Sequence, residues 1–162
     1  MPTLSVGATN RNRGVTLLEM LIVVTLMALV AGISYPSVAS GVNSLRLRAA
    51  SDGIVGFLNT AIDRAERRQQ AIQILISPRD NLMTARSPDL GFNRQFDLPG
   101  AIRIVSVLPN SGIAPDEPRT FLIYPGGTVP AIGVEIANQD GRRRLVRIDP
   151  ITGVPGSELE AQ

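Results

Sequence analysis

The chain of 162 residues contains no cysteine, no histidine and no lysine. Without cysteine it cannot form a disulfide bond, use a catalytic thiol or bind a metal through thiolates. Without histidine it lacks the commonest general base and metal ligand, and without lysine it has neither a Schiff base nor a P-loop. Catalysis would depend on carboxylates, hydroxyls and arginine alone, and the sequence establishes no nucleophile–base pair. We therefore expect neither an enzyme nor a cofactor.

A net charge is also lacking once the first residues are set aside. All 16 basic residues are arginines, the formal net charge is +2, and the isoelectric point is near 9.9. Arg11 and Arg13 precede an apolar run; without these two, 14 arginines face 14 acidic residues. The isoelectric point is high because almost nothing titrates between the carboxylates and the tyrosines. Global charge therefore gives no reason to expect a nucleic-acid-binding protein.

The most distinctive feature is an apolar run from Val15 to Tyr35, in which Glu19 is the only charged residue. A helix needs about 20 residues to cross a bilayer core of roughly 30 Å. A carboxylate costs roughly 2.5–3.5 kcal/mol at the helix centre and less near its end, and the apolar side chains outweigh that penalty. Membrane insertion therefore tolerates Glu19 but does not explain it.

Three interpretations compete for this N-terminal region. A secretory signal peptide has a basic start, but its apolar stretch is usually about 7–15 residues long and carries no carboxylate. An ordinary single-pass anchor would be held with its N-terminus in the cytoplasm by the basic flank. The third interpretation uses Gly14, which stands between the basic flank and the apolar run, and Glu19, the fifth residue after it.

The stretch Arg13-Gly14-Val15-Thr16-Leu17-Leu18-Glu19 resembles the class III signal of type IV prepilins and type II secretion pseudopilins. The resemblance implies that a prepilin peptidase cleaves between Gly14 and Val15 and methylates the new amine of Val15, although the family usually has Phe there. It further implies that Glu19 serves assembly by meeting the terminal amine of a neighbouring subunit in the filament. Such a pairing is strong in a medium of low dielectric constant. Pro36 matches a helix kink common in this family, as expected for a residue that removes a backbone hydrogen bond.

Beyond Pro36 the apolar residues recur with helical spacing to about Gln70, which predicts an amphipathic helix. The predicted buried stripe has two parts separated by a slip of one residue: Val38, Val42, Leu45 and Ala49, then Ile54, Leu58, Ala61 and Ala65. Gly53 and Gly56 each lower helix propensity by up to about 1 kcal/mol. Packing on a globular head must therefore hold this part of the helix.

After Gln70 the pattern changes to short strands rich in Val, Ile and Leu. We expect strands at 71–77, 101–108, 120–124, 131–137 and 144–149, and weaker ones at 82–84 and 92–98. Asp140-Gly141 is typical of a hairpin turn, and residues 109–118 form a loop that is a candidate contact surface. The predicted fold class is α+β and pilin-like, with a long N-terminal helix packed on a C-terminal antiparallel β-sheet head.

The C-terminal part of the chain, from about residue 121, strengthens the resemblance. Residues 121–128, Gly141-Arg142 and residues 146–153 are similar to the C-terminal half of H-type minor pseudopilins and their minor-pilin relatives. The expected division is a leader (1–14), a transmembrane helix (15–35), an amphipathic half-helix (36–70) and a periplasmic head (71–162).

That resemblance implies a single-pass protein of the bacterial inner membrane, with a cytoplasmic N-terminus and a periplasmic head. The implied function is that of a minor pseudopilin in the periplasmic pseudopilus of a type II secretion system. Its implied partners are the prepilin peptidase, other major and minor pseudopilins, and the inner-membrane assembly platform.

A group of arginines surrounds the predicted hairpin: Arg142, Arg143, Arg144 and Arg147. One interpretation is a solvated turn with Asp140 and Asp149 as partial counter-charges. The alternative is a minor pilin of a type IV pilus system that binds DNA, because residues 141–144 look like the Gly-Arg-x-Arg motif of competence-branch minor pilins. Arginines on a turn can clamp phosphates without sequence preference, but no aromatic residue lies near enough to stack bases.

Acidic residues offer the remaining candidate for a metal site. Asp116-Glu117 and Asp140 could indicate calcium, which major pseudopilins bind. They lack the ligand pattern of a calcium loop of about 12 residues. We therefore expect no metal.

Overall fold

A computed structural model describes residues 15–88, 91–110, 112, 114–127 and 129–159. The described residues form one long helix followed by eight strands. Two compact units divide the chain, the first ending at Val38 and the second running from Ala39 to the C-terminus. The finer division into leader, transmembrane helix, half-helix and head stays a prediction.

Helix α1 spans Leu17–Arg68, close to the predicted range. Arg67 and Arg68 occupy its last turn, where cations interact favourably with the helix dipole. Gln69 then adopts a φ of 51°, and the N–H of Gln70 donates to the carbonyl of Ala65 at 3.2 Å. This is the hydrogen-bond pattern of a Schellman motif, which ends a helix by satisfying its last carbonyls. The assigned helix includes Pro36, and the kink predicted there stays a prediction.

The first part of α1 is apolar and exposed. Every side chain described from Val15 to Tyr35 is exposed. An 18-residue window of the helix has a mean hydropathy of 2.4, and none of it is buried within the structure. By length and composition, α1 is able to cross a membrane.

The predicted buried stripe is correct in its second half and wrong in its first. Ile54, Leu58, Ala61 and Ala65 are fully buried, whereas Val38, Val42, Leu45 and Ala49 are exposed. The helix buries Leu47, Ala50 and Ser51 instead. These positions continue the spacing of the correct half without a slip, because one straight helix face keeps a single period of about 3.6 residues.

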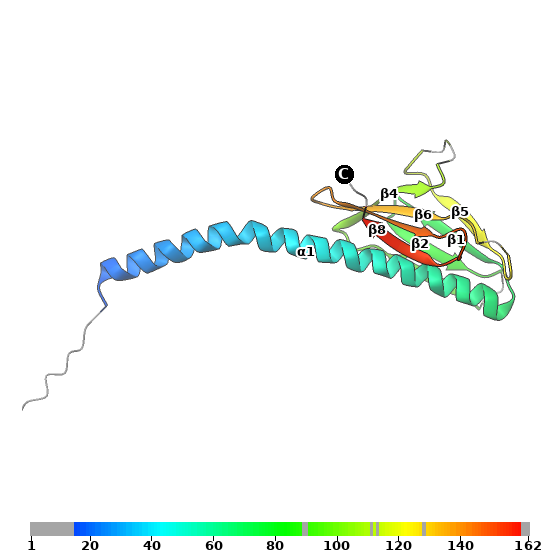
Figure 1. Cartoon of the computed structure of the whole chain (residues 1–162), viewed down its shortest axis with the longest axis horizontal. Coiled ribbons are helices and arrows are strands. Elements are labelled where there is room, and N and C mark those ends of the chain that lie inside the picture. Colours follow the sequence, from blue (N-terminus) through cyan, green and yellow to red (C-terminus); the bar gives the residue numbers. More distant parts are fainter. Residues whose placement is uncertain (1–14, 89–90, 111, 113, 128, 160–162) are drawn as a thin grey trace, which may run out of the picture. The chain divides into compact units, whose positions relative to one another are not determined.

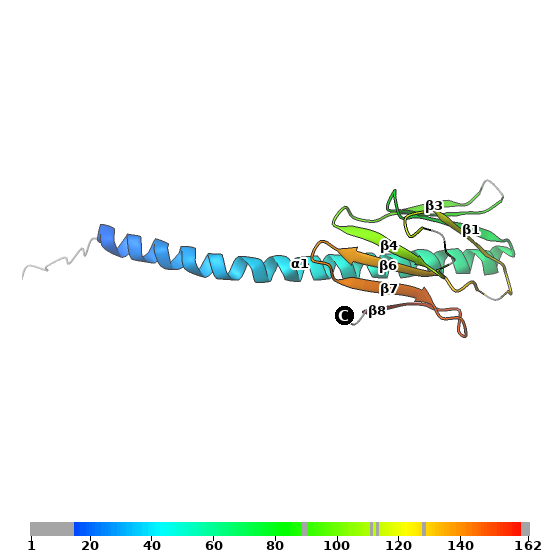
Figure 2. The same cartoon turned by 90° about the horizontal axis from the view of Figure 1, so that it is seen from above.

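The head contains two four-stranded antiparallel sheets rather than the single sheet expected. The first sheet has the order β3-β2-β1-β5, with β1 at Ile72–Ser77, β2 at Leu82–Arg86, β3 at Asn93–Asp97 and β5 at Arg119–Ile123. The second has the order β4-β6-β7-β8, with β4 at Ile102–Leu108, β6 at Gly133–Asn138, β7 at Arg143–Ile148 and β8 at Pro155–Leu159. The seven predicted strands are confirmed, and β8 was not predicted. Figure 1 and Figure 2 show the strands along one side of the C-terminal part of α1. Figure 2 shows β3 and β8 at the two outer edges.

A shared core joins the helix to the inner faces of both sheets. It contains Leu47, Ala50, Ile54, Phe57, Leu58, Ala61 and Ala65 from α1, Ile72, Ile74, Ile76, Met83, Ala85 and Ile123 from the first sheet, and Ile102, Ile104, Val107, Val134, Ile136, Val146 and Ile148 from the second. Along β1, β4, β5 and β7, the alternation of the strand directs these residues inward and mostly polar residues outward, whereas β2 and β6 bury residues on both faces. The outer faces and the loops are therefore where function has to be sought.

Asn81 connects the two sheets through its side chain. It lies in the turn between β1 and β2 with a φ of 55°, a conformation that Asn tolerates better than most residues. Its Nδ2 donates to the carbonyl oxygen of Ile102 at 2.7 Å, and its Oδ1 accepts from the N–H of Ile104 at 2.9 Å. The side-chain amide of Asn81 thus pairs with two backbone groups at the start of β4. Because β4 is an edge strand, these groups would otherwise have no partner in the sheet.

Candidate functional site

The N-terminus of α1 holds the residues on which the sequence analysis depends. Gly14 lies outside the described residues, and the predicted cleavage junction therefore does too. Val15 is the first described residue and is 59% exposed. The N–H of Glu19 donates to Oγ1 of Thr16 at 3.2 Å, just before the first helical residue. Thr16 is therefore the N-cap of the helix, and Glu19 is its third residue.

Thr16-Leu17-Leu18-Glu19 has the spacing of a capping box, a signal that the sequence analysis missed. A carboxylate in the first turn also interacts favourably with the helix dipole, by roughly 0.3–1 kcal/mol at an exposed site. The helix start therefore supplies a local reason for an acid at position 19. The capping bond uses the backbone N–H of Glu19 and not its carboxylate. The side chain of Glu19 is exposed and forms no salt bridge among the described residues.

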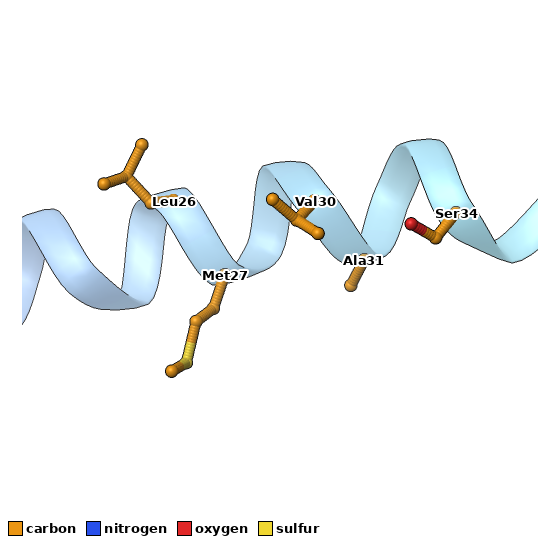
Figure 3. A pocket seen from close by; sticks show the side chains of 5 residues that line it. All are labelled: Leu26, Met27, Val30, Ala31 and Ser34. Carbon is orange, nitrogen blue, oxygen red and sulfur yellow. The ribbon is translucent and has the colours of Figure 1, made fainter.

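Cleavage before Val15 would place a cationic amine one helical turn from Glu19, within reach of an i,i+4 pairing. The geometry thus permits a pairing within one chain or between neighbours, as the resemblance implies. The apolar surface that follows is suited to other helices or to acyl chains. Leu26, Met27, Val30, Ala31 and Ser34 line a shallow, open hollow there, with one hydroxyl among apolar side chains (Figure 3).

The predicted arginine cluster is divided between the two faces of the second sheet. Arg143 and Arg147 are exposed and alternate with the buried Val146 and Ile148 along β7, so they lie on the outer face. Arg144 lies on the same side as those buried residues and is only partly exposed. The strand period of two residues therefore separates side chains that the sequence places together.

Each of these arginines has a partner within the chain. Arg143 pairs with Glu135 at 2.7 Å, Arg147 pairs with Glu158 at 3.0 Å, and Arg144 donates to Oγ of Ser157 at 3.1 Å. Arg142 donates to Oγ of Ser44 on α1. The expected counter-charges, Asp140 and Asp149, form no salt bridge with these arginines in the described part of the chain, although the charge of Arg147 adds to the backbone hydrogen bonds that lower the pKa of Asp149. Glu135 and Glu158 are the salt-bridge partners because they lie on neighbouring strands of the same face.

The β6–β7 hairpin is confirmed, and its tip is held on α1. Nδ2 of Asn43 donates to Oδ1 of Asp140 at 3.2 Å, and the Arg142–Ser44 bond lies beside it. Oδ1 of Asn138 accepts from the N–H groups of Asp140 and Arg142, at 3.1 and 2.9 Å. The two bonds of Asn138 shape the turn, and the bonds to Asn43 and Ser44 dock it on the helix. Both docking residues lie just before Leu47, the first buried residue among the described side chains of α1.

The remaining acidic candidates serve the loops. Asp116, in the predicted contact loop, pairs with Arg79 at 2.9 Å, and the hydrogen bond from Arg79 lowers the pKa of Asp116. Oδ1 of Asp149 accepts from the N–H groups of Ile151 and Thr152, and these bonds lower the pKa of Asp149. Among the described residues, no group of three or more acidic side chains is placed to hold a metal ion.

Comparison with known protein families matches residues 9–35 to the prokaryotic N-terminal methylation motif. Neither the curated proteins nor the solved structures give a significant match to this chain. The matched segment contains Gly14, Val15 and Glu19 and the whole apolar run from Val15 to Tyr35.

This motif is typical of type IV pilins and pseudopilins, and it overlaps the first part of α1. The later part of α1 packs on antiparallel sheets, so the fold is α+β and pilin-like. The motif implies processing by a prepilin peptidase and assembly with other pilins, and the apolar helix indicates anchoring in the inner membrane before assembly.

Proposed function

We propose that this protein is a minor pseudopilin of a type II secretion system, cleaved between Gly14 and Val15, N-methylated at Val15, and built into the periplasmic pseudopilus. The methylation motif, with Glu19 exposed at the first turn of an apolar helix, carries this proposal. Its topology would be a single pass with the N-terminus in the cytoplasm and the head in the periplasm. Its partners would be the other major and minor pseudopilins and the inner-membrane assembly platform.

Intact mass and N-terminal analysis of the membrane-extracted protein test the processing step. We expect a chain that begins at N-methylated Val15 when the prepilin peptidase is present, and an uncut chain when the peptidase gene is deleted. A chain cut after the apolar run, near Ala39, would instead identify an ordinary signal peptide and refute the proposal.

The role of Glu19 is separable from its place in the capping box. Glu19→Gln keeps a residue that suits the third helical position of a capping box but removes the negative charge. Thr16→Ala removes the capping hydroxyl and keeps the charge. We expect Glu19→Gln to be cleaved and inserted but to lose crosslinking to other pseudopilins, and Thr16→Ala to retain crosslinking. The reverse pattern would show that Glu19 serves only the helix start.

The alternative, a type IV minor pilin that contacts DNA through Arg142 to Arg144, finds less support in the contacts. Arg143 is neutralised by Glu135, and Arg144 is turned toward the inner side of its sheet. A gel shift of the purified protein at several salt concentrations tests this alternative. Salt-sensitive binding that is lost in Arg142→Ala/Arg144→Ala but retained in Arg67→Ala, a change on the exposed face of α1, would favour the DNA-binding function.

A further inference from the structure

Three of the four edge strands in the described part of the head carry features that oppose pairing with another chain. β3 carries the charged residues Arg94 and Asp97. β4 has a bulge between Ile104 and Ser106, and β8 begins with Pro155. Charged side chains, bulges and proline are the features by which edge strands avoid the addition of a further strand.

The fourth edge strand, β5, lacks these features after its first residue. The stretch 120–124 is Thr-Phe-Leu-Ile-Tyr, without a charge, a proline or a glycine, and the register of β5 on β1 is continuous. Arg119, the first residue, is buried and donates to the carbonyl oxygen of Pro109, so its charge is held within the head. β5 is therefore open to the addition of a strand.

The strand register shows which backbone groups of β5 are unpaired. In an antiparallel sheet, alternate residues of a strand direct their N–H and C=O groups to opposite neighbours. The N–H of Ser87 donates to the carbonyl oxygen of Phe92, so the odd-numbered residues of β2 bond to β3 and the even-numbered ones bond to β1. By the same alternation, the even-numbered residues of β1 bond to the odd-numbered residues of β5. The N–H and C=O groups of Thr120 and Leu122 therefore point away from the sheet, and no described residue pairs with them.

Apolar side chains stand beside this open edge. Leu122 is 45% exposed, and Tyr124, just beyond β5, is 54% exposed. Phe121, on the opposite face of the strand, is only partly buried against the core. Exposed aromatic and aliphatic side chains are typical of protein interfaces. Because β5 presents uncharged side chains on both faces of its open edge, aliphatic or β-branched side chains of an added strand fit there better than charged ones.

We propose that β5 is a docking site for an extended segment of another protein, which adds to the first sheet as a further strand. The N–H and C=O groups of Thr120 and Leu122 form the backbone hydrogen bonds, as in other cases of strand addition. The segment has about five residues, the usual length of a strand, with aliphatic or β-branched side chains. A second folded copy would have to match the twist and register of a rigid edge, whereas an extended segment adapts to them. The inference rests on the first sheet alone and does not depend on the assignment to a secretion system.

Amide hydrogen exchange of the full-length protein in zwitterionic detergent, measured residue by residue by NMR, tests this site. The probe is a short peptide of alternating threonine and valine residues with a lysine at each end, and the control peptide has proline at its centre. In the free protein we expect fast exchange at Thr120 and Leu122, and slow exchange at the alternating residues that bond to β1. With saturating probe we expect exchange at Thr120 and Leu122 to slow about tenfold or more, while exchange at Gln95 of β3 stays unchanged.

Four results would overturn the proposal. The first two are no slowing with the probe and equal slowing with the proline peptide. Equal slowing at Gln95 would show that the peptide adds to any edge. Slowing that rises with protein concentration in the absence of the probe would identify a second copy of the chain as the occupant.

Variants at Leu122 separate the backbone from the side chain. Leu122→Pro removes the outward N–H, which is tolerated on an edge strand, and Leu122→Lys places a charge at the edge. Leu122→Val is the matched control, because it keeps both the N–H and an apolar side chain. We expect the first two variants to weaken probe binding about tenfold or more and the control to bind like the unchanged protein.

Slow exchange at Ile74, which bonds to Phe121, reports that β5 stays on β1 in each variant. Should Leu122→Pro lose this protection, Leu122→Lys decides alone. Unchanged probe binding in a variant that keeps the protection of Ile74, either Leu122→Pro or Leu122→Lys, would refute the assignment.

Discussion

Gly53→Ala is expected to destabilise the head, whereas Gly56→Ala, three residues along the same helix, is expected to stabilise it. A Cβ atom on Gly53 would lie 2.6 Å from Cζ and 2.9 Å from Cε2 of Phe96, while a Cβ atom on Gly56 meets nothing within 4 Å. Ordinary contact begins at 3.4 Å, so the ring of Phe96 would have to retreat by about 0.8 Å.

The two substitutions share one energetic term and differ in another. Both gain helix propensity, worth about 0.8–1 kcal/mol for Gly→Ala in a helix interior. Only Gly53→Ala adds overpacking, which typically costs about 1–3 kcal/mol. The ring of Phe96 lies beside that of Phe57, with the two centroids 6.2 Å apart, so a retreat of Phe96 would disturb this contact. We therefore expect Gly56→Ala to raise the free energy of unfolding by up to about 1 kcal/mol, and Gly53→Ala to lower it by as much as about 2 kcal/mol.

Urea denaturation of the unit that begins at Ala39, followed by circular dichroism, measures both changes. The double variant Gly53→Ala/Phe96→Leu completes a thermodynamic cycle, in which residues in contact typically couple by about 0.5–3 kcal/mol. Equal stabilisation by the two alanine substitutions, or additive effects in the cycle, would refute the close packing of Phe96 on Gly53.

Three further predictions concern the loops of the head. Asn81→Gly keeps the positive φ but removes both bonds to β4, so we expect a loss of about 1–3 kcal/mol in stability and faster hydrogen exchange at the amide of Ile104; unchanged exchange would contradict the bridge between the sheets. The hydrogen bond from Arg79 lowers the pKa of Asp116 in the folded protein, so the ionised carboxylate stabilises the fold. This stabilisation is present above the unfolded pKa of 3.8 and is lost as the pH falls through the lower folded pKa. An NMR titration should show that Arg79→Gln moves this pKa back toward its ordinary value, and no movement would rule out the ion pair. Arg142→Ala, which frees the hairpin from Ser44, should cost under about 1 kcal/mol because the contact is exposed, yet it should speed amide exchange in residues 40–46 and not in residues 54–65.

The helix and most strands were predictable because their period is local. The error in the buried stripe shows the limit of that reasoning. Val38, Val42 and Leu45 have the same spacing as a core-facing set, and only the sheets above the helix decide which face is buried. The correct face was recoverable from Ile54 and Leu58 by extending one period backwards without a slip.

Strand β8 and the ion pairs depended on pairing that a single sequence does not reveal. The composition of Pro155-Gly156-Ser157 is typical of a turn. These residues form the start of β8 because they pair with the edge of β7, and proline is tolerated at the first position of a strand. The ion-pair partners of the arginines were not predicted for a similar reason. Glu135 and Glu158 are 8 and 11 residues away from Arg143 and Arg147 along the chain. Only the register of β6 and β8 against β7 brings them next to these arginines.

The site at the helix start was predicted in its chemistry but not in its geometry. The spacing from Gly14 to Glu19 indicated processing and assembly, which the methylation motif supports. The capping bond from Glu19 to Thr16 was readable from the same four residues and was missed.

The docked hairpin has a mechanical consequence. Between Ala39 and Leu47 the helix buries no side chain, and among the contacts described above it meets the rest of the head through Asn43 and Ser44. Exposed bonds of this kind break and re-form cheaply in water, whereas separation of Leu47 or Ile54 from the sheets would open the core. The hairpin tip is therefore expected to detach from residues 39–46 and to dock again far more often than the helix beyond Leu47 leaves the sheets.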